Sequence, residues 1–310
     1  MKSASHLPIL FSTRDYRYLH TELMVQGAFV SGEIDIKVFP DGETYHRILT
    51  DVADQDVILI GGTIDDRNTL ELYDLAQGLA HAGSRSLRIV IPYFGYSTME
   101  RAVQRGEIAK AKNRALLFSS LPVCAEANHV YLMDLHSEGI PYYFEREIRC
   151  THLYCKGLIM ESATQAFGTD FVLAATDAGR AKWVESLSNE MGVKSAFVYK
   201  HRISGSETSI TGVNADVKGR NVIIYDDMVR TGGSLMQAAK AYREAGANRI
   251  YCITTHGLFN QDALSKIEAQ GIIEKVICTN THPLALQQTS GLLQVKSVSS
   301  IIFDALKPDL

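Results

Sequence analysis

Short apolar runs rich in β-branched residues alternate along the chain with longer stretches in which apolar residues recur at helical spacing. In the N-terminal half, residues 57–60 are predicted to form a buried strand, and residues 68–82 carry leucines and alanines along one helical face. A second strand is predicted at residues 87–92, which completes a βαβ unit. A helix at residues 107–119 and a strand at residues 130–135 continue this order.

The C-terminal half repeats the same alternation. Strands are predicted at residues 171–175, 195–199, 222–225 and 249–254, and helices at residues 180–191 and 234–245. This order is typical of a mostly parallel sheet flanked by crossover helices. A chain of 310 residues exceeds the usual size of a single core. We therefore predict an α/β protein of two domains, residues 1–148 and 149–310, with the last residues able to pack back on the first domain.

Composition narrows the class of protein. A content of 46% hydrophobic and 21% charged residues is ordinary for a soluble globular enzyme. The formal net charge of -4 predicts no broad attraction to nucleic acid or to an anionic membrane, so any anion site must be local. No apolar run approaches the roughly 20 residues that span a bilayer. Five cysteines without CxxC spacing argue against a disulfide framework or a zinc site, and we expect a cytoplasmic protein.

The most informative segment is residues 222–234, VIIYDDMVRTGGS, in which a hydrophobic strand leads through two acids to a glycine-rich helix start. Gly232 and Gly233 let backbone N–H groups approach an anion, and the helix N-terminus adds partial positive charge. Thr231 and Ser234 add hydroxyl donors, so the arrangement suits a terminal phosphate. A plain strand-to-helix turn with a serine cap is the alternative.

The two acids precede this phosphate-binding loop. Asp226 and Asp227 stand at the carboxyl end of the predicted strand, about one ribose ring away from the loop. Their carboxylates can accept hydrogen bonds from the vicinal hydroxyls of a sugar. A phosphorylated pentose therefore fits the acids and the loop together.

This segment resembles the phosphoribosyl-binding loop of the phosphoribosyltransferase-like superfamily. Other segments resemble the ribose-phosphate pyrophosphokinases, in the order found there: FPDGE at 39–43, IPYFGYSTMER at 91–101, MDLH at 133–136, TDAGR at 176–180, YKHR at 199–202 and TNTHP at 279–283. The resemblance covers nearly the whole chain. It implies two phosphoribosyltransferase-like domains, each a mostly parallel sheet flanked by helices.

The resemblance implies that the N-terminal half binds ATP. Phe39, Asp41 and Glu43 match the adenine-binding loop, where an aromatic ring can stack on the base and carboxylates can accept from its amine. Arg101 matches a segment that touches ATP. The resemblance also implies that the adenine-binding loop at 39–43 reaches into the site of a neighbouring subunit. A homo-oligomer is therefore implied, either a dimer or a multiple of dimers. Taken alone, Asp-Gly after Pro is also a common turn, and the aromatic run before Arg101 is also typical of core packing.

A metal and a diphosphate loop are implied in the same way. His136 matches a metal-linked catalytic histidine and Asp177 a magnesium-associated carboxylate, so Mg²⁺ is the expected cofactor. Asp177, Ala178, Gly179 and Arg180 match the loop that binds the diphosphate. A histidine at a strand end and an aspartate before Ala-Gly are also ordinary structural features.

Lys200 and Arg202 match the basic pair of the family's mobile catalytic loop. The glycine, serine and threonine residues at 204–212 are typical of a flexible lid. Closure of such a lid would bring two cations onto a transferring phosphoryl group, where positioning and charge neutralisation supply most of the catalysis. A solvated basic loop is the alternative.

Four positions differ from the best-known branch of the family. Thr98 replaces an arginine that contacts ATP, and Met99 replaces a neighbouring glutamine. Arg180 stands at a usual glycine position and Arg230 at an often acidic one. The loss of one arginine and the gain of two keep positive charge available, so we interpret the chain as a divergent member.

The resemblance implies transfer of diphosphate from Mg-ATP to the C1 hydroxyl of ribose 5-phosphate, which gives phosphoribosyl diphosphate and AMP. Two alternatives remain open. Thr98 and Met99 motivate a non-catalytic homologue that regulates an active paralogue. The segment 222–234 alone motivates a phosphoribosyltransferase, which leaves the N-terminal half unexplained.

Overall fold

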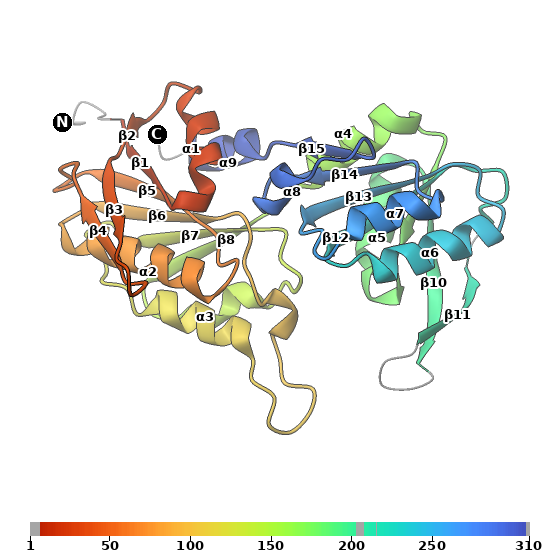
Figure 1. Ribbon diagram of the computed structural model, residues 1–310, viewed down its shortest axis with the longest axis horizontal. Helices are drawn as coiled ribbons and strands as arrows, with labels where there is room; N and C mark the ends of the chain where they lie inside the picture. The colour runs from red at the N-terminus through yellow and green to blue at the C-terminus, as the bar shows by residue number, and fades with distance from the viewer. Residues whose placement is uncertain (1–6, 203–207, 215, 308–310) are drawn as a thin grey trace. The chain divides into compact units, whose positions relative to one another are not determined.

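The computed structural model describes residues 7–202, 208–214 and 216–307. The chain divides into two compact units, each with its own sheet (Figure 1). Unit 1 comprises Met1–Leu153 and the C-terminal segment Val298–Leu310, and unit 2 comprises Tyr154–Ser297. Both units have helices packed on mostly parallel strands, which confirms the predicted α/β class.

Unit 1 contains a six-stranded sheet in the order β2-β1-β5-β6-β7-β8, and its paired strands are all parallel. The strands are β1 (Ile9–Ser12), β2 (Val30–Ser31), β5 (Asp56–Ile60), β6 (Ser86–Ile91), β7 (Asn128–Met133) and β8 (Ile148–Leu153). A separate antiparallel hairpin joins β3 (Ile34–Val38) to β4 (Thr44–Ile48). The helices are α1 (Arg17–Met24), α2 (Asp66–His81), α3 (Lys110–Ser119) and α9 (Ser299–Leu306).

Alternate strand residues of unit 1 bury against different helices. Leu72 of α2 and Phe118 of α3 join a core with Leu59 and Ile89 of the central strands. Helix α9 instead contacts α1, and an edge-on contact between Phe29 and Phe303 brings the C-terminal segment into unit 1, with ring centroids 6.0 Å apart. This two-sided burial follows from the period of two along a strand, which places neighbouring side chains on opposite faces.

Unit 2 contains a seven-stranded sheet in the order β11-β10-β9-β12-β13-β14-β15. The strands are β9 (Val172–Ala175), β10 (Lys194–Arg202), β11 (Thr208–Val213), β12 (Val222–Val229), β13 (Ile250–Gly257), β14 (Lys275–Thr279) and β15 (Leu293–Lys296). The pair β10 and β11 is antiparallel, and the other pairs are parallel. The helices are α4 (Lys156–Phe167), α5 (Ala181–Met191), α6 (Gly233–Glu244), α7 (Ala263–Gln270) and α8 (Leu284–Gln287).

The strand order of unit 2 reverses between β9 and β12. Helix α5 leads from β9 to β10 on one side, whereas α6 leads from β12 to β13 on the other. The two helices also cover opposite faces, because Leu235 of α6 packs with Ile224 in one core while Trp183 of α5 stacks on the neighbouring Tyr225. In an open α/β sheet, such a reversal leaves a crevice at the carboxyl ends of the two strands, where ligands bind.

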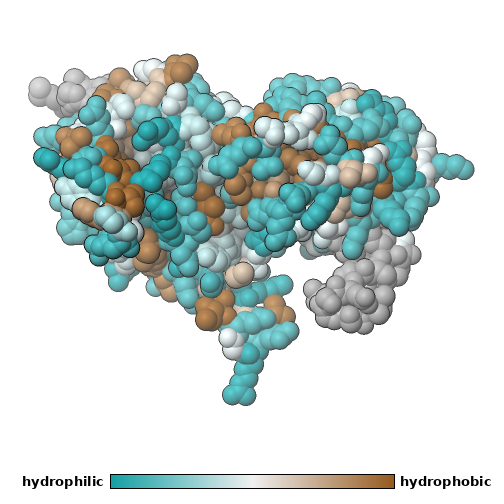
Figure 2. All heavy atoms as spheres, in the orientation of Figure 1, coloured by the Kyte–Doolittle hydropathy of each residue, from teal (hydrophilic) through white to brown (hydrophobic). Residues whose placement is uncertain are grey.

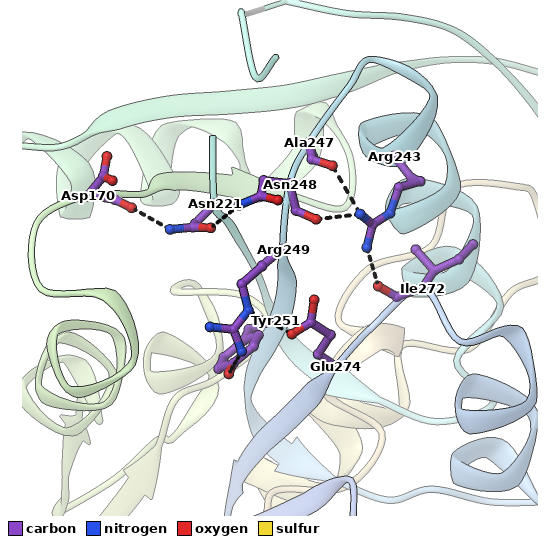
Figure 3. A network of polar contacts seen from close by, with 9 residues as sticks. All are labelled: Asp170, Asn221, Arg243, Ala247, Asn248, Arg249, Tyr251, Ile272 and Glu274. Atoms are coloured by element: carbon purple, nitrogen blue, oxygen red, sulfur yellow. Dashed lines mark hydrogen bonds and ion pairs between the residues drawn. The ribbon is translucent and has the colours of Figure 1, made fainter. Parts of the chain in front are cut away.

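A polar network lies at the amino-terminal ends of the strands in this sheet, opposite the crevice (Figure 3). Asn221, just before β12, donates to the carbonyl of Asp170 at 3.2 Å. Arg249, just before β13, pairs with Glu274 at 2.8 Å. Arg243 near the end of α6 donates to the carbonyls of Ala247 and Ile272, among others. These contacts join the amino-terminal ends of the strands, and we interpret the network as structural.

The observed elements differ from the predicted ones mainly at the carboxyl ends of strands. The prediction ended one strand at residue 225, but β12 continues to Val229 because its polar residues still pair with β13. The predicted helix at 107–119 begins at Lys110. No helix among the described residues is long and apolar enough to cross a membrane. All five cysteines, each of them within the described residues, are free.

Candidate active site

The two predicted sugar-binding acids lie within β12, at the carboxyl edge of the sheet in unit 2. Asp226 is paired in register with Thr254 of β13, and Asp227 follows it on the other face of the strand. The acids therefore belong to the strand itself and not to the loop after it. Because β9 ends beside them, the reversal point of the sheet carries both acids and the start of the TDAGR segment.

The Asp226 carboxylate is held by two protein donors. The Thr176 hydroxyl donates to Oδ2 at 2.9 Å, and the backbone amide of Asp227 donates to Oδ1 at 3.0 Å. Burial, and after it the negative charge of the neighbouring Asp227, raise the pKa of Asp226 to about 8. The two neighbouring carboxyls therefore titrate together, and burial makes the pair keep a proton to a higher pH than an isolated aspartate does.

Asp227 forms an ion pair with Arg180. Its Oδ2 lies 2.6 Å from Nη2 of Arg180, and the side chains are 4% and 17% exposed, respectively. Arg180 ends the short 3-10 helix Ala178–Arg180, which begins after Asp177 accepts a hydrogen bond from the Gly179 amide at 2.9 Å. The structure thus brings the predicted diphosphate loop and a predicted sugar carboxylate into direct contact. Both residues were predicted site residues, but their pairing was not predicted from the sequence.

The predicted phosphate loop connects β12 to α6. Helix α6 begins at Gly233, and Gly232 is its N-cap residue with a φ of 76°, a left-handed conformation that glycine adopts without strain. The N-cap residue is thus a glycine and not Ser234, so the serine cap of the alternative interpretation is wrong. Thr231 and Ser234 are both exposed. Unsatisfied N–H groups at the start of a 12-residue helix suit an anion.

The predicted adenine loop forms the turn of the β3–β4 hairpin in unit 1. The Phe39 amide donates to the Glu43 carbonyl at 2.8 Å, and the Glu43 amide donates to Asp41 Oδ1 at 3.1 Å. Gly42 has a φ of 94°, so the segment is also the Asp-Gly turn that the alternative interpretation predicted. The Phe39 ring is 47% exposed. The turn thus presents an exposed aromatic ring and two exposed acids.

Arg101 lies in an exposed loop between the 3-10 helix Ser97–Met99 and α3, and its Nε is 3.5 Å from Glu100 Oε1. Figure 2 shows this projecting loop as mostly hydrophilic. The aromatic run before it divides into two parts. Tyr93 and Phe94 are buried in the core, as the alternative interpretation predicted. Tyr96 is partly exposed at the base of the loop, where Lys110 lies over its ring at 4.7 Å.

His136 is half-buried in the segment that follows β7. This segment is anchored to β8, because the amide of Leu135 donates to Nε2 of His152 at 2.9 Å. Farther along, the Tyr143 hydroxyl donates to the Glu100 carbonyl at 2.8 Å, which ties the segment to the loop that carries Arg101. The sequence analysis did not single out Tyr143, and a tyrosine in an irregular segment gives no pattern from which this contact could be predicted.

Lys200 and Arg202 lie at the end of β10, and their side chains are outside the part of the chain that the structure describes. The backbone of β10 pairs with β11 in an antiparallel ladder, with Lys200 opposite Ile210. Residues 208–212, which were predicted to belong to a flexible lid, thus form part of strand β11, whereas residues 204–207 of that prediction lie outside the described residues. The roles of both cations remain predictions from the sequence.

A pocket that the sequence analysis did not predict opens in unit 1 between β1, α1 and the base of the hairpin. Its volume is about 420 Å³, and its lining includes Arg14, Arg17 and His20, together with Ser12 and Ser31. The residues predicted to bind the nucleotide, in the hairpin turn and in the loop that carries Arg101, are not among the residues that line this pocket. In the sequence, Arg14 and Arg17 lie three residues apart, and this basic pair could have pointed to the pocket.

The described residues include no group of three or more His, Cys, Asp or Glu side chains placed to hold a metal ion. Mg²⁺ bound with a nucleotide does not need one, since it commonly uses one or two carboxylates plus substrate phosphates and water. Asp177 is a half-buried carboxylate on a loop and fits this mode. His136 fits less directly, because imidazole is a softer ligand than Mg²⁺ prefers.

Comparisons with known proteins agree along the chain. Residues 8–121 match the family model described as the N-terminal domain of ribose phosphate pyrophosphokinase, and residues 180–308 match the phosphoribosyl synthetase-associated domain. A ribose-phosphate pyrophosphokinase of Parasynechococcus marenigrum is 30% identical over 300 residues, which cover 96% of this chain and 89% of that protein. One of Thermococcus kodakarensis is 30% identical over 88% of this chain and 94% of its own.

A solved structure has the same fold. The phosphoribosylpyrophosphate synthetase of Mycobacterium smegmatis superposes with a TM-score of 0.87 over 97% of this chain and 98% of that chain, at 23% sequence identity.

Proposed function

Because the chain belongs to the ribose-phosphate pyrophosphokinase family, we propose that it transfers diphosphate from Mg-ATP to ribose 5-phosphate. The observation that carries this proposal is the grouping of Thr176, Arg180, Asp226 and Asp227 at the sheet reversal of unit 2, directly before the amino end of α6. The products are phosphoribosyl diphosphate and AMP.

The acceptor binds along β12 and the loop that follows it. Gly232 and Gly233 with the hydroxyls of Thr231 and Ser234 hold the 5-phosphate at the amino end of α6, where backbone N–H groups and the helix dipole favour an anion. Asp226 and Asp227 accept hydrogen bonds from the ribose hydroxyls. Binding at both ends fixes the C1 hydroxyl, and this orientation removes much of the entropic barrier to attack.

The donor residues inferred from the sequence are found in each unit, in the hairpin turn and loops of unit 1 and in the loop after β9 of unit 2. Phe39 stacks on adenine, Asp41 and Glu43 accept from its amine, and Arg101 contacts the phosphates. Asp177, Ala178, Gly179 and Arg180 hold the diphosphate that is transferred. Asp177 and His136 are the side chains proposed to lie near the nucleotide-bound metal ion. Mg²⁺, when bound, neutralises negative charge on the phosphates of the nucleotide.

The reaction is a direct displacement. The C1 oxygen attacks the β-phosphorus, the bond from that phosphorus to the α–β bridging oxygen breaks, AMP leaves with the oxygen, and the hydroxyl proton is released. Lys200 and Arg202 stabilise the charge that develops on the transferring group. No covalent enzyme intermediate is needed.

We also propose that the hairpin turn completes the site of a second copy in a homo-oligomer, a dimer or a multiple of dimers. The exposed Phe39, together with the exposed Val38 and Tyr45 on the same hairpin, supports this arrangement, because exposed apolar side chains grouped on one element are typical of an interface. The free cysteines agree with a cytoplasmic location.

The test is an assay of the purified chain with ribose 5-phosphate, ATP and Mg²⁺, in which AMP and phosphoribosyl diphosphate are both quantified. Equal amounts of the two products are expected. Thr98 and Met99 favour a second candidate, a non-catalytic homologue that regulates an active relative. That candidate predicts neither product with ATP or other nucleoside triphosphates, together with altered activity of an active relative when the two are mixed.

A further inference from the structure

Arg180 belongs to the diphosphate loop in sequence but contacts the sugar side of the site. Its guanidinium lies 2.6 Å from Oδ2 of Asp227, whose side chain is 4% exposed. A carboxylate buried to this extent needs an opposite charge or a proton nearby. Arginine suits this role because it stays charged and presents its donors in a fixed planar fork. The ion pair is therefore a built part of the site and not a surface contact.

Protein donors already engage much of the acidic pair. The Asp227 amide donates to Asp226 Oδ1 and the Thr176 hydroxyl to Asp226 Oδ2, while Asp227 Oδ2 faces Arg180. At least three of the four carboxylate oxygens thus have a protein partner. A hard divalent cation binds through several negatively charged oxygens, and it is attracted weakly where a guanidinium already offsets their charge.

We propose that Arg180 is the resident cation of the Asp226–Asp227 pair, supplying the positive charge that a divalent cation would supply to a bare pair of carboxylates. Sugar hydroxyls then bind to the pair without a metal ion between them. The identity of the sugar rests on the proposed function, whereas the charge relationship rests only on the contacts among these three side chains. A glycine at position 180 offers no such charge.

The first measurement counts bound Mn²⁺ by the loss of the free-ion signal in electron paramagnetic resonance, with no sugar or nucleotide present. Arg180→Gly removes the side chain, and Arg180→Gln keeps a hydrogen-bond donor but removes the charge. We expect each variant to bind about one Mn²⁺ per chain more than the original protein, or to bind Mn²⁺ at least about tenfold more tightly. The double variant Arg180→Gly with Asp227→Asn should lose this gain.

Two variants are used because the loss of a buried partner can destabilise unit 2. Arg180→Gln is the milder change, and the emission of Trp183 on α5 reports whether unit 2 is folded. A folded Arg180→Gln variant whose Mn²⁺ binding equals that of the original protein would overturn the proposal. A gain that persists when Asp227 is also changed to Asn would overturn it as well, because the new ion would then lie elsewhere.

The second measurement is calorimetric titration with ribose 5-phosphate, once in EDTA and once in Mg²⁺. The affinity of the original protein for ribose 5-phosphate should be the same in EDTA and in Mg²⁺, within about threefold. Arg180→Gln should bind ribose 5-phosphate at least about tenfold more weakly in EDTA than in Mg²⁺. A strong Mg²⁺ requirement in the original protein would contradict the resident cation. If ribose 5-phosphate binds to no variant under either condition, the proposed acceptor is wrong, and the Mn²⁺ titration still decides the role of Arg180.

Discussion

The ring of Trp183 stacks on that of Tyr225, with centroids 4.1 Å apart and planes inclined by 17°. Trp183 lies in the first turn of α5, directly after the diphosphate loop, and Tyr225 immediately precedes Asp226 on β12. The chain has one tryptophan. This single fluorophore is thus in contact with the strand that carries both sugar-side acids.

We therefore predict that ribose 5-phosphate changes the tryptophan emission in a saturable manner, with the dissociation constant found by calorimetry. The physical reason is that a ligand held by Asp226 and Asp227 alters the field and packing around the adjacent Tyr225. The variant Trp183→Phe should keep its calorimetric binding and lose the optical signal. Calorimetric binding without any spectral change would place the ligand away from β12.

A second prediction concerns stability against pH. Burial and the charge of Asp227 raise the pKa of Asp226 to about 8, so the folded chain keeps a proton that the unfolded chain releases at lower pH. This contribution is fully present at acid pH and is lost as the pH rises toward 8. The free energy of unfolding of unit 2 should thus fall by at most about 1.4 kcal/mol per pH unit between pH 5 and 8 on account of this group.

Urea denaturation followed through Trp183 emission at several pH values measures this slope. Asp226→Asn carries no titratable proton, so the difference in unfolding free energy between the original protein and the variant should change steadily with pH and level off above 8. Asp170→Asn, at the exposed opposite edge of the sheet, is the matched control and should show a constant difference. If the free energy of unfolding changes with pH in the same way for the original protein and for Asp226→Asn, the carboxyl of Asp226 titrates in the folded protein as it does in the unfolded chain, which contradicts the prediction.

A third prediction tests the packing of unit 1. Gly95 follows β6, and its amide donates to Thr63 Oγ1 at 2.7 Å, while a Cβ built on Gly95 would lie 1.9 Å from the Thr63 carbonyl oxygen. Gly95→Ala should lower the free energy of unfolding of unit 1 by about 1–3 kcal/mol or more, since backbone atoms must move apart. Thermal or urea denaturation with circular dichroism measures the loss.

The control for this substitution is Gly78→Ala in the last turn of α2. The nearest atom to a Cβ there is the flexible tip of Ile48, at 3.4 Å. Alanine also has the higher helix propensity, by up to about 1 kcal/mol. Gly78→Ala should therefore be neutral or stabilising. Equal losses for the two variants would mean that Thr63 and Gly95 do not approach as closely as the structure indicates.

The strands and helices could largely be predicted from the sequence because hydrophobic periodicity is a local property. The strand with Val222 and Ile224 and the helix with Leu235 follow from apolar spacing alone. The pairing of Arg180 with Asp227 could not be predicted in this way, since it depends on which strand lies beside which. The extension of β12 past Tyr225 had the same cause, because the hydrogen bonds there come from the neighbouring strand β13 and leave no mark in the local sequence pattern.

A fourth prediction tests the oligomeric site. If the hairpin turn of one copy completes the site of another, a variant in the turn and a variant in the catalytic loop should complement each other. Phe39→Ala and Lys200→Ala are each expected to be nearly inactive as pure proteins. Mixed oligomers should recover up to about a quarter of the activity, the statistical share of sites with both residues intact. Absence of recovery despite proven subunit exchange would place each site within one chain.

The final prediction isolates the sugar-side charge. Asp227→Asn keeps the size of the side chain but removes the negative charge that accepts strong hydrogen bonds from hydroxyls. The loss of one charge-assisted hydrogen bond costs about 1.5 to 3 kcal/mol, which corresponds to a fall of roughly 10- to 150-fold in kcat/KM for ribose 5-phosphate. Affinity for the nucleotide should stay nearly unchanged, because the proposed adenine contacts lie on the hairpin turn of unit 1.

Titration of both ribose 5-phosphate and Mg²⁺ distinguishes a sugar role of Asp227 from a metal role. A metal ligand would show itself as a raised Mg²⁺ requirement, whereas a sugar ligand raises the demand for ribose 5-phosphate alone. The change also leaves the largely buried guanidinium of Arg180, 17% exposed, without its charge partner, so stability must be measured beside the kinetics. A folded Asp227→Asn variant with unchanged ribose 5-phosphate kinetics would remove Asp227 from the site, and with it the central support for acceptor binding along β12.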